Sequence, residues 1–163
     1  MGMDADADIS FGVAFDEGQD FPWTENGDIE DWWRKINGFV PLYEYDWVRD
    51  PTPATYNHIA VFKDGRALTD EELKAHYQHK KDWDEAHPMP VMERSFGSDA
   101  RSCTLLVVPS SHIHGSWDSP TKFDPSKLLV SLKDLEAFRQ FMKTYMPDAP
   151  TDNYGWMLTA YFG

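Results

Sequence analysis

The sequence predicts an α+β fold with a mainly antiparallel sheet of about five strands and about three helices. Segments with strand character and segments with helical spacing do not alternate regularly along the chain, which argues against a doubly wound parallel sheet. The chain has 163 residues, of which 41% are hydrophobic and 15% aromatic. That is enough to bury a core, so we expect residues 1–163 to form a single domain.

Five segments are expected to be strands. Apolar residues alternate over 9–15 (ISFGVAF), as in a half-buried strand. The short, β-branched run 104–108 (TLLVV) is typical of a central strand. The first eight residues alternate Asp with small side chains. They could form either a flexible acidic terminus or an extended segment. The expected strands are residues 9–15, 57–63, 91–96, 104–108 and 154–162.

Three helices are predicted from their start signals. A helix over 28–37 begins with acidic residues, which suit the positive end of the helix dipole. Thr69 and Glu72 form a capping box, which predicts a helix over 70–86. A similar serine N-cap opens a third helix with apolar residues at core spacing, which runs to about residue 145.

The segments between these elements are expected to be irregular. Residues 41–56 contain three prolines, and residues 109–127 are rich in Ser, Pro and Gly. Residues 97–102 are expected to form a turn. None of these three segments is predicted to contribute a strand.

Negative charge is concentrated at the N-terminal end of the chain. The net charge is −13, and the first 33 residues hold ten carboxylates and no Lys or Arg. Such a field repels nucleic acid and membrane surfaces and attracts basic protein surfaces. The ten acidic residues are Asp4, Asp6, Asp8, Asp16, Glu17, Asp20, Glu25, Asp28, Glu30 and Asp31.

A fixed row of carboxylates can imitate the phosphates of DNA. If residues 4–8 are extended, their three Asp share one side in steps of about 6.6 Å, at a rise of about 3.3 Å per residue. Trp32 and Trp33 cannot face one direction on a helix, so one ring should be partly exposed as an interface anchor unless both pack on opposite sides. We therefore predict a partner-binding site made of the ten acids, Trp32 and Trp33. Its expected partner is the basic DNA-binding surface of another protein.

Three stretches carry a resemblance to a known group of proteins. They are Phe21-Pro22-Trp23, Asp31-Trp32-Trp33 and residues 155–163 (GWMLTAYFG). Together they resemble a widespread group of small acidic proteins of tailed bacteriophages, and in particular the phage inhibitors of host DNA gyrase that mimic DNA. The resemblance implies a non-enzymatic inhibitor with no catalytic residue and no cofactor. It also implies DNA gyrase as the target.

The sequence also predicts where the protein acts. The N-terminus lacks the basic and apolar regions of a signal peptide, and no apolar run approaches the roughly 20 residues that cross a bilayer. The single cysteine, Cys103, excludes an internal disulfide. We therefore expect a protein of the host bacterial cytoplasm.

Other interpretations remain open. The aromatic residues could serve a different anti-defence protein that binds a host protein or a small molecule. His112 and His114 form an H-x-H pair whose rings would share one side of a strand, as metal sites require, so a small metal-dependent hydrolase is a further alternative. A third ligand is not evident, and ordinary surface or hydrogen-bonded histidines are the default. A two-fold homodimer would lengthen a DNA mimic and is also open.

Overall fold

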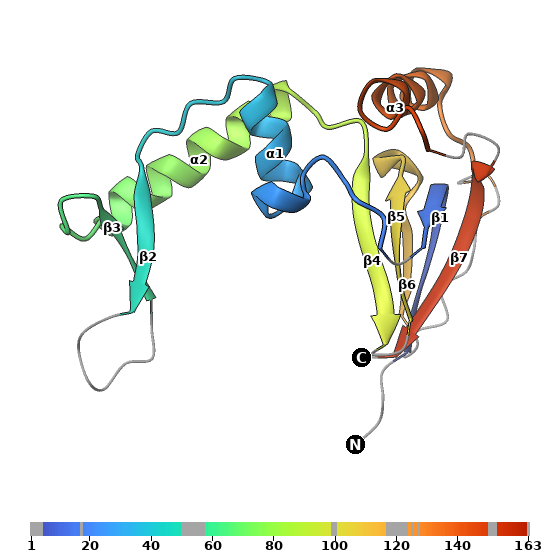
Figure 1. Cartoon of the computed structure of the whole chain (residues 1–163), viewed down its shortest axis with the longest axis horizontal. Helices are drawn as coiled ribbons and strands as arrows, with labels where there is room; N and C mark the ends of the chain where they lie inside the picture. Colours follow the sequence, from blue (N-terminus) through green and yellow to red (C-terminus); the bar gives the residue numbers. More distant parts are fainter. Residues whose placement is uncertain are drawn as a thin grey trace. The chain divides into compact units, whose positions relative to one another are not determined.

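The computed structural model describes residues 5–16, 18–49, 58–98, 101–116, 124, 126, 128–149 and 153–162. The chain divides into two compact units (Figure 1). The first consists of Met1–Ile29 with Met89–Gly163, and the second of Glu30–Pro88. The single domain expected from the length of the chain stays a prediction. No helix in these ranges is long and apolar enough to cross a membrane.

The expected α+β class is confirmed. The described residues form three α-helices, an antiparallel sheet of five strands and a two-stranded hairpin. The first unit holds the sheet and one helix: β1 (Ala5–Phe15), β4 (Met92–Ser98), β5 (Arg101–Val107), β6 (Ile113–Ser116), β7 (Gly155–Phe162) and α3 (Leu132–Tyr145).

Strand β1 is the centre of the sheet. Along one edge it pairs with β7 from Ala5 to Gly12. Along the other edge it pairs first with β6 and then with β5, and β5 pairs in turn with β4. The short 3-10 helix η2 (Pro109–Ser111) separates β5 from β6, so these two strands pair with successive parts of the same edge of β1. Residues near the start of β1 are therefore enclosed by strands on both sides.

Gly12 allows the close backbone approach at the point where β1 meets β5 and β7 together. A Cβ atom at this position would lie 2.1 Å from the carbonyl oxygen of Leu106 and 2.7 Å from the Cα of Val107. The residue across the other edge, Gly155, has open space where its Cβ would be. Only glycine fits at position 12 without moving β5.

The core of the first unit is built by the sheet and α3. Ser131 caps α3 by accepting a hydrogen bond from the backbone N–H of Asp134. Phe138 and Met142 of this helix are fully buried, as are Val13 and Leu106 of the sheet. Burial of these apolar side chains is the main stabilising term of the unit.

The second unit combines two helices and a hairpin. Its elements are α1 (Ile29–Ile36), β2 (Tyr45–Arg49), β3 (His58–Phe62) and α2 (Asp70–Ala86). Strands β2 and β3 are antiparallel, with Tyr45 opposite Phe62. Helix α2 opens with the predicted capping box, in which Thr69 accepts from Glu72 N and the Glu72 carboxylate accepts from Thr69 N.

The structure corrects three expectations about strands. Strand β2 lies inside 41–56 and β6 inside 109–127, both of which were expected to be irregular. Strands β4 and β5 extend into the expected turn over 97–102. Four of the five β2 residues are exposed, and its alternation is limited to Tyr45 and Trp47, which is too short to predict a strand among three prolines. Strand β6 has four residues, one of them glycine, and it forms because β1 offers it an edge.

Candidate partner-binding site

The predicted carboxylates are distributed over both units. Asp4 and Glu17 lie outside the described residues, and Asp6 is described only by its backbone in β1. Glu30 and Asp31 belong to α1 in the second unit, whereas the earlier acids belong to the first. The ten acids therefore do not come from one structural element, and each group has its own surroundings.

Residues 16–28, which we call the acidic segment, connect β1 to α1. Four of its carboxylates are exposed: Asp16, Asp20, Glu25 and Asp28. The backbone is turned by a hydrogen bond from Gln19 N to Asp16 O at 3.4 Å. A second turn follows at the 3-10 helix η1 (Thr24–Asn26), where Thr24 N donates to Phe21 O at 3.1 Å. Gly18 and Gly27 supply the positive φ angles, 89° and 99°, that these turns use.

Four aromatic rings hold the acidic segment to the first unit. We call Phe15, Phe21, Trp23 and Phe141 the aromatic anchor. Phe21 makes an edge contact with Phe15 at 5.2 Å and stacks on Trp23 at 5.0 Å. The Trp23 ring is 2% exposed and lies 6.3 Å from the ring of Phe141 in α3. Since Trp23 is buried and Phe21 is half-buried, the backbone that carries Asp16, Asp20, Glu25 and Asp28 is held by ring packing.

Asp8 is the principal correction to the predicted site. It is 1% exposed, so its carboxylate cannot meet a partner. Arg94 Nη2 donates to its Oδ2 at 2.8 Å, and His114 Nδ1 lies 2.8 Å from its Oδ1. Burial on its own would raise the pKa of Asp8, but the hydrogen bonds from His114 and Arg94 outweigh it and lower the pKa. Asp8 is therefore a buried, ionised group that organises the centre of the sheet.

The H-x-H pair is part of the same network. His112 Nδ1 lies 3.0 Å from Ser10 Oγ, and its Nε2 lies 3.9 Å from Asp8 Oδ1. Burial lowers the pKa of His112, so the ring is neutral at pH 7 and the longer contact is not an ion pair. Both rings converge on Asp8, His114 from β6 and His112 from the residue between η2 and β6.

This arrangement combines serine, histidine and carboxylate side chains, which are also residue types of hydrolases. Ser10 is 4% exposed, so its hydroxyl cannot reach a substrate. In the described ranges, no group of three His, Cys, Asp or Glu residues is placed to hold a metal ion. Asp8 and Ser10 of β1 contact His114 and His112, and these contacts join β1 to the chain segment of β6. Sequence reasoning missed Ser10 and Arg94, although the period-2 spacing of Asp8, Ser10 and Gly12 places these three on one face.

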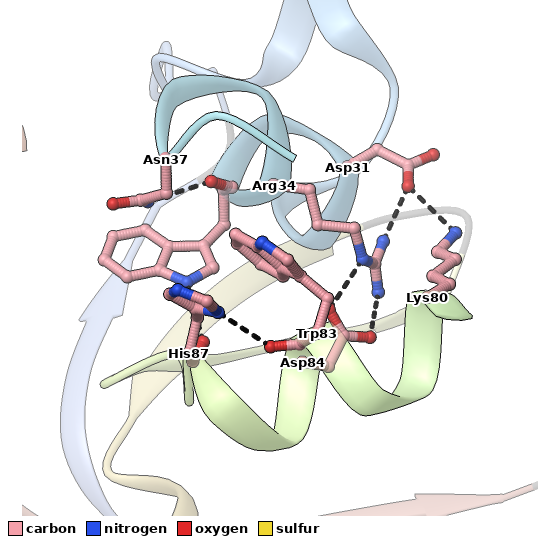
Figure 2. A network of polar contacts seen from close by, with 8 residues as sticks. Asp31, Arg34, Asn37, Lys80, Trp83, Asp84 and His87 are labelled. Atoms are coloured by element: carbon pink, nitrogen blue, oxygen red, sulfur yellow. Dashed lines mark hydrogen bonds and ion pairs between the residues drawn. The ribbon is translucent and has the colours of Figure 1, made fainter. Parts of the chain in front are cut away.

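Asp31 lies in a polar network between α1 and α2 (Figure 2), and Trp33 joins this network through hydrogen bonds to His87 and Asn37. Arg34 donates to both carboxylate oxygens of Asp84 at 2.8 Å and to Asp31 at 2.6 Å. Lys80 also donates to Asp31 at 3.0 Å. Burial would raise the pKa of Asp31, but its bonds and proximity to Lys80 and Arg34 lower it. The charge of Asp31 is thus largely compensated inside the unit.

The two tryptophans differ in exposure. Trp32 is buried at 6% exposure, whereas Trp33 is half-buried and donates its indole N–H to the carbonyl of His87 at 3.2 Å. Asn37 donates to the carbonyl of Trp33 at 2.9 Å and closes the last turn of α1 (Figure 2). Trp32 therefore cannot act as an exposed anchor, and Trp33 offers only part of its ring.

Comparisons of the chain with protein-family models, curated proteins and solved structures find no match. The site is therefore defined by its own geometry. Among the described acids of the predicted site, Asp16, Asp20, Glu25 and Asp28 are exposed on the acidic segment. Glu30 and Asp31 are exposed on α1, where Asp31 is paired with Arg34 and Lys80.

Proposed function

We propose that this protein is a non-enzymatic, phage-encoded inhibitor that mimics DNA and blocks the DNA-binding surface of a host enzyme, with DNA gyrase as the first candidate. One observation carries the proposal. The aromatic anchor fixes the acidic segment while Asp16, Asp20, Glu25 and Asp28 remain exposed. The resemblance to phage gyrase inhibitors supplies the candidate target.

A preorganised array is what a mimic of a stiff polyanion requires. Because the acidic segment is already ordered in the folded protein, binding does not have to order it again, and affinity is not lost to that cost. Exposed carboxylates on a protein of net charge −13 also steer it toward a basic surface. Association should therefore be fast and should weaken as salt rises.

The proposed mimicry uses fewer carboxylates than the ten acids predicted from the sequence. Asp8 forms an ion pair with Arg94 inside the sheet, and Asp31 is paired with Arg34 and Lys80. These two carboxylates support the fold of their units. We place the mimicry in the acidic segment, where the chain has no Lys or Arg between residues 16 and 28.

The experiment is inhibition of DNA supercoiling by purified gyrase, with and without added duplex DNA. The test variant combines Asp16→Asn, Asp20→Asn, Glu25→Gln and Asp28→Asn. We expect it to inhibit at least about tenfold more weakly than the wild type, since four charge contacts of modest worth are lost together. Excess duplex should displace the wild-type protein from gyrase.

A matched control separates the segment from net charge. The variant Glu71→Gln, Glu85→Gln, Glu136→Gln and Asp148→Asn removes the same number of negative charges from exposed positions elsewhere. It should inhibit like the wild type. Equal loss in both variants would mean that only total charge matters. Failure of duplex DNA to compete would show that the protein does not occupy a DNA site.

A further inference from the structure

The second unit contains a cleft that the proposed function does not use. It has a volume of about 740 Å³ and is lined by residues of α1, α2 and the hairpin with the connections beside them. This volume is within the range of small-molecule sites. Six of its lining side chains carry aromatic rings: Phe39, Tyr43, Tyr45, Trp47, His76 and Tyr77. Tyr45 and Trp47 share one face of β2, and their rings meet edge to face at 5.8 Å.

His76 is the most informative residue of this cleft. It lies on α2 and is 8% exposed, and its Nδ1 is buried with no hydrogen-bond partner among the described residues. Its neighbours are rings: Tyr45 at 5.2 Å, Tyr77 at 6.1 Å and Tyr43 at 6.4 Å. Buried polar atoms are nearly always satisfied, so an orphaned nitrogen in a residue that lines the cleft points to a missing partner.

The charges of the cleft restrict what that partner can be. Four Lys or Arg side chains and three carboxylates line it, so the wall is close to neutral. Several of these are already paired: Asp31 accepts from Lys80 at 3.0 Å and from Arg34 at 2.6 Å, and Glu44 pairs with Lys63. A polyphosphate or a multiply charged cation would have to break these pairs. An uncharged ligand would not.

Burial and the nearby Lys80 and His79 lower the pKa of His76, so its ring is neutral at pH 7. A neutral imidazole offers one N–H and one lone pair, which suits the mixed donors and acceptors on the edge of a heterocycle. Exposed aromatic side chains at the mouth, such as Trp47 at 51% exposure, provide faces on which a flat ring can stack.

We propose that this cleft binds a planar, uncharged nitrogen heterocycle of the nucleobase class, which stacks on the aromatic rings and completes the hydrogen bonding of His76. The site is separate from the acidic segment, so its occupancy does not depend on DNA mimicry.

The test is calorimetric titration of the full-length protein with adenosine, guanosine, cytidine and uridine, and with their monophosphates. The test variant is His76→Phe, which keeps the ring and removes both nitrogens. We expect saturable binding of at least one nucleoside, weakened about tenfold or more in His76→Phe, and no gain from the added phosphate. The matched control is His58→Phe, the same change at an exposed histidine of β3 that does not line the cleft; it should bind like the wild type.

Three outcomes would overturn the proposal. They are the absence of saturable binding for all four nucleosides, affinity that His76→Phe leaves unchanged, and monophosphates that bind much more tightly than nucleosides. If His76→Phe is poorly folded, Trp47→Ala replaces it, because an exposed side chain can be truncated without unfolding the unit. If Trp47→Ala binds the nucleosides as tightly as the wild type does, the proposal is refuted.

Discussion

Replacing Asp8 by Asn should destabilise the first unit strongly, although Asn has almost the same shape. The wild-type carboxylate receives two hydrogen bonds at 2.8 Å, from Arg94 and His114, and its side chain is 2% exposed. Bonds to a charged group are worth about 1.5–3 kcal/mol each, and breaking a buried charge pair costs about 3–5 kcal/mol. The side chains of Arg94 and His114 are 34% and 50% exposed, so in the variant they can donate hydrogen bonds to water, which offsets part of the lost free energy. We expect a cost of about 3 kcal/mol at pH 7, near the lower end of that range.

The measurement is urea unfolding followed by circular dichroism, with hydrogen exchange of β1, β5 and β7 to assign the change to the sheet. A loss of about 3 kcal/mol shifts the midpoint by about 1.5 M if the slope is about 2 kcal/mol per M. The control is Asp16→Asn, an exposed carboxylate of the acidic segment, which should change stability by less than about 0.5 kcal/mol. Equal effects of the two substitutions would refute the buried role of Asp8.

Dependence on pH gives a second check on Asp8. Because the folded protein lowers the pKa of this carboxyl, the ionised form is favoured in the folded state. The resulting stability is fully present above the ordinary Asp value of 3.8 and is lost as the pH falls through the lower folded value. The difference in the free energy of unfolding between the wild type and Asp8→Asn should therefore persist at pH 5 and shrink below pH 3.8. A difference that disappears well above that pH would contradict the assignment.

Two further substitutions test the packing of the first unit. Trp23→Ala removes a 2%-exposed ring of the aromatic anchor, so we expect the free energy of unfolding to fall by about 3–5 kcal/mol in chemical denaturation. Amide protons of the acidic segment should also exchange faster. Unchanged exchange in that segment would mean that the anchor does not hold it. Gly12→Ala places a Cβ 2.1 Å from Leu106 O, so we expect the free energy of unfolding to fall by about 3 kcal/mol or more. The control is Gly155→Ala on the facing strand, which has open space and should change the melting midpoint little. Similar losses at both glycines would rule out the close approach at position 12.

Local signals in the sequence predicted the helices well. The Thr69 and Glu72 capping box predicted α2 over its observed span, because such a cap depends only on side chains within one turn. The apolar spacing that follows Ser131 likewise predicted α3. These elements follow from interactions between residues close in the chain.

Strand β6 and the surroundings of Asp8 could not be predicted in the same way. Strand β6 has too few residues for a period to appear, and it exists because β5 leaves part of the edge of β1 open after the 3-10 helix η2. Asp8 looked like its neighbours in the acidic N-terminal region. Its partners Arg94 and His114 are far away in sequence and meet it only when β1 lies inside the sheet.

The sequence by itself determined the α+β class, the helix starts and the excess of negative charge at the N-terminal end, because these depend on composition and short-range patterns. Only the tertiary structure decided which carboxylates reach solvent. It buried Asp8, paired Asp31 with Lys80 and left Asp16, Asp20, Glu25 and Asp28 exposed. The physical reason is that exposure and ion pairing depend on contacts between distant segments, which the order of residues along the chain does not display.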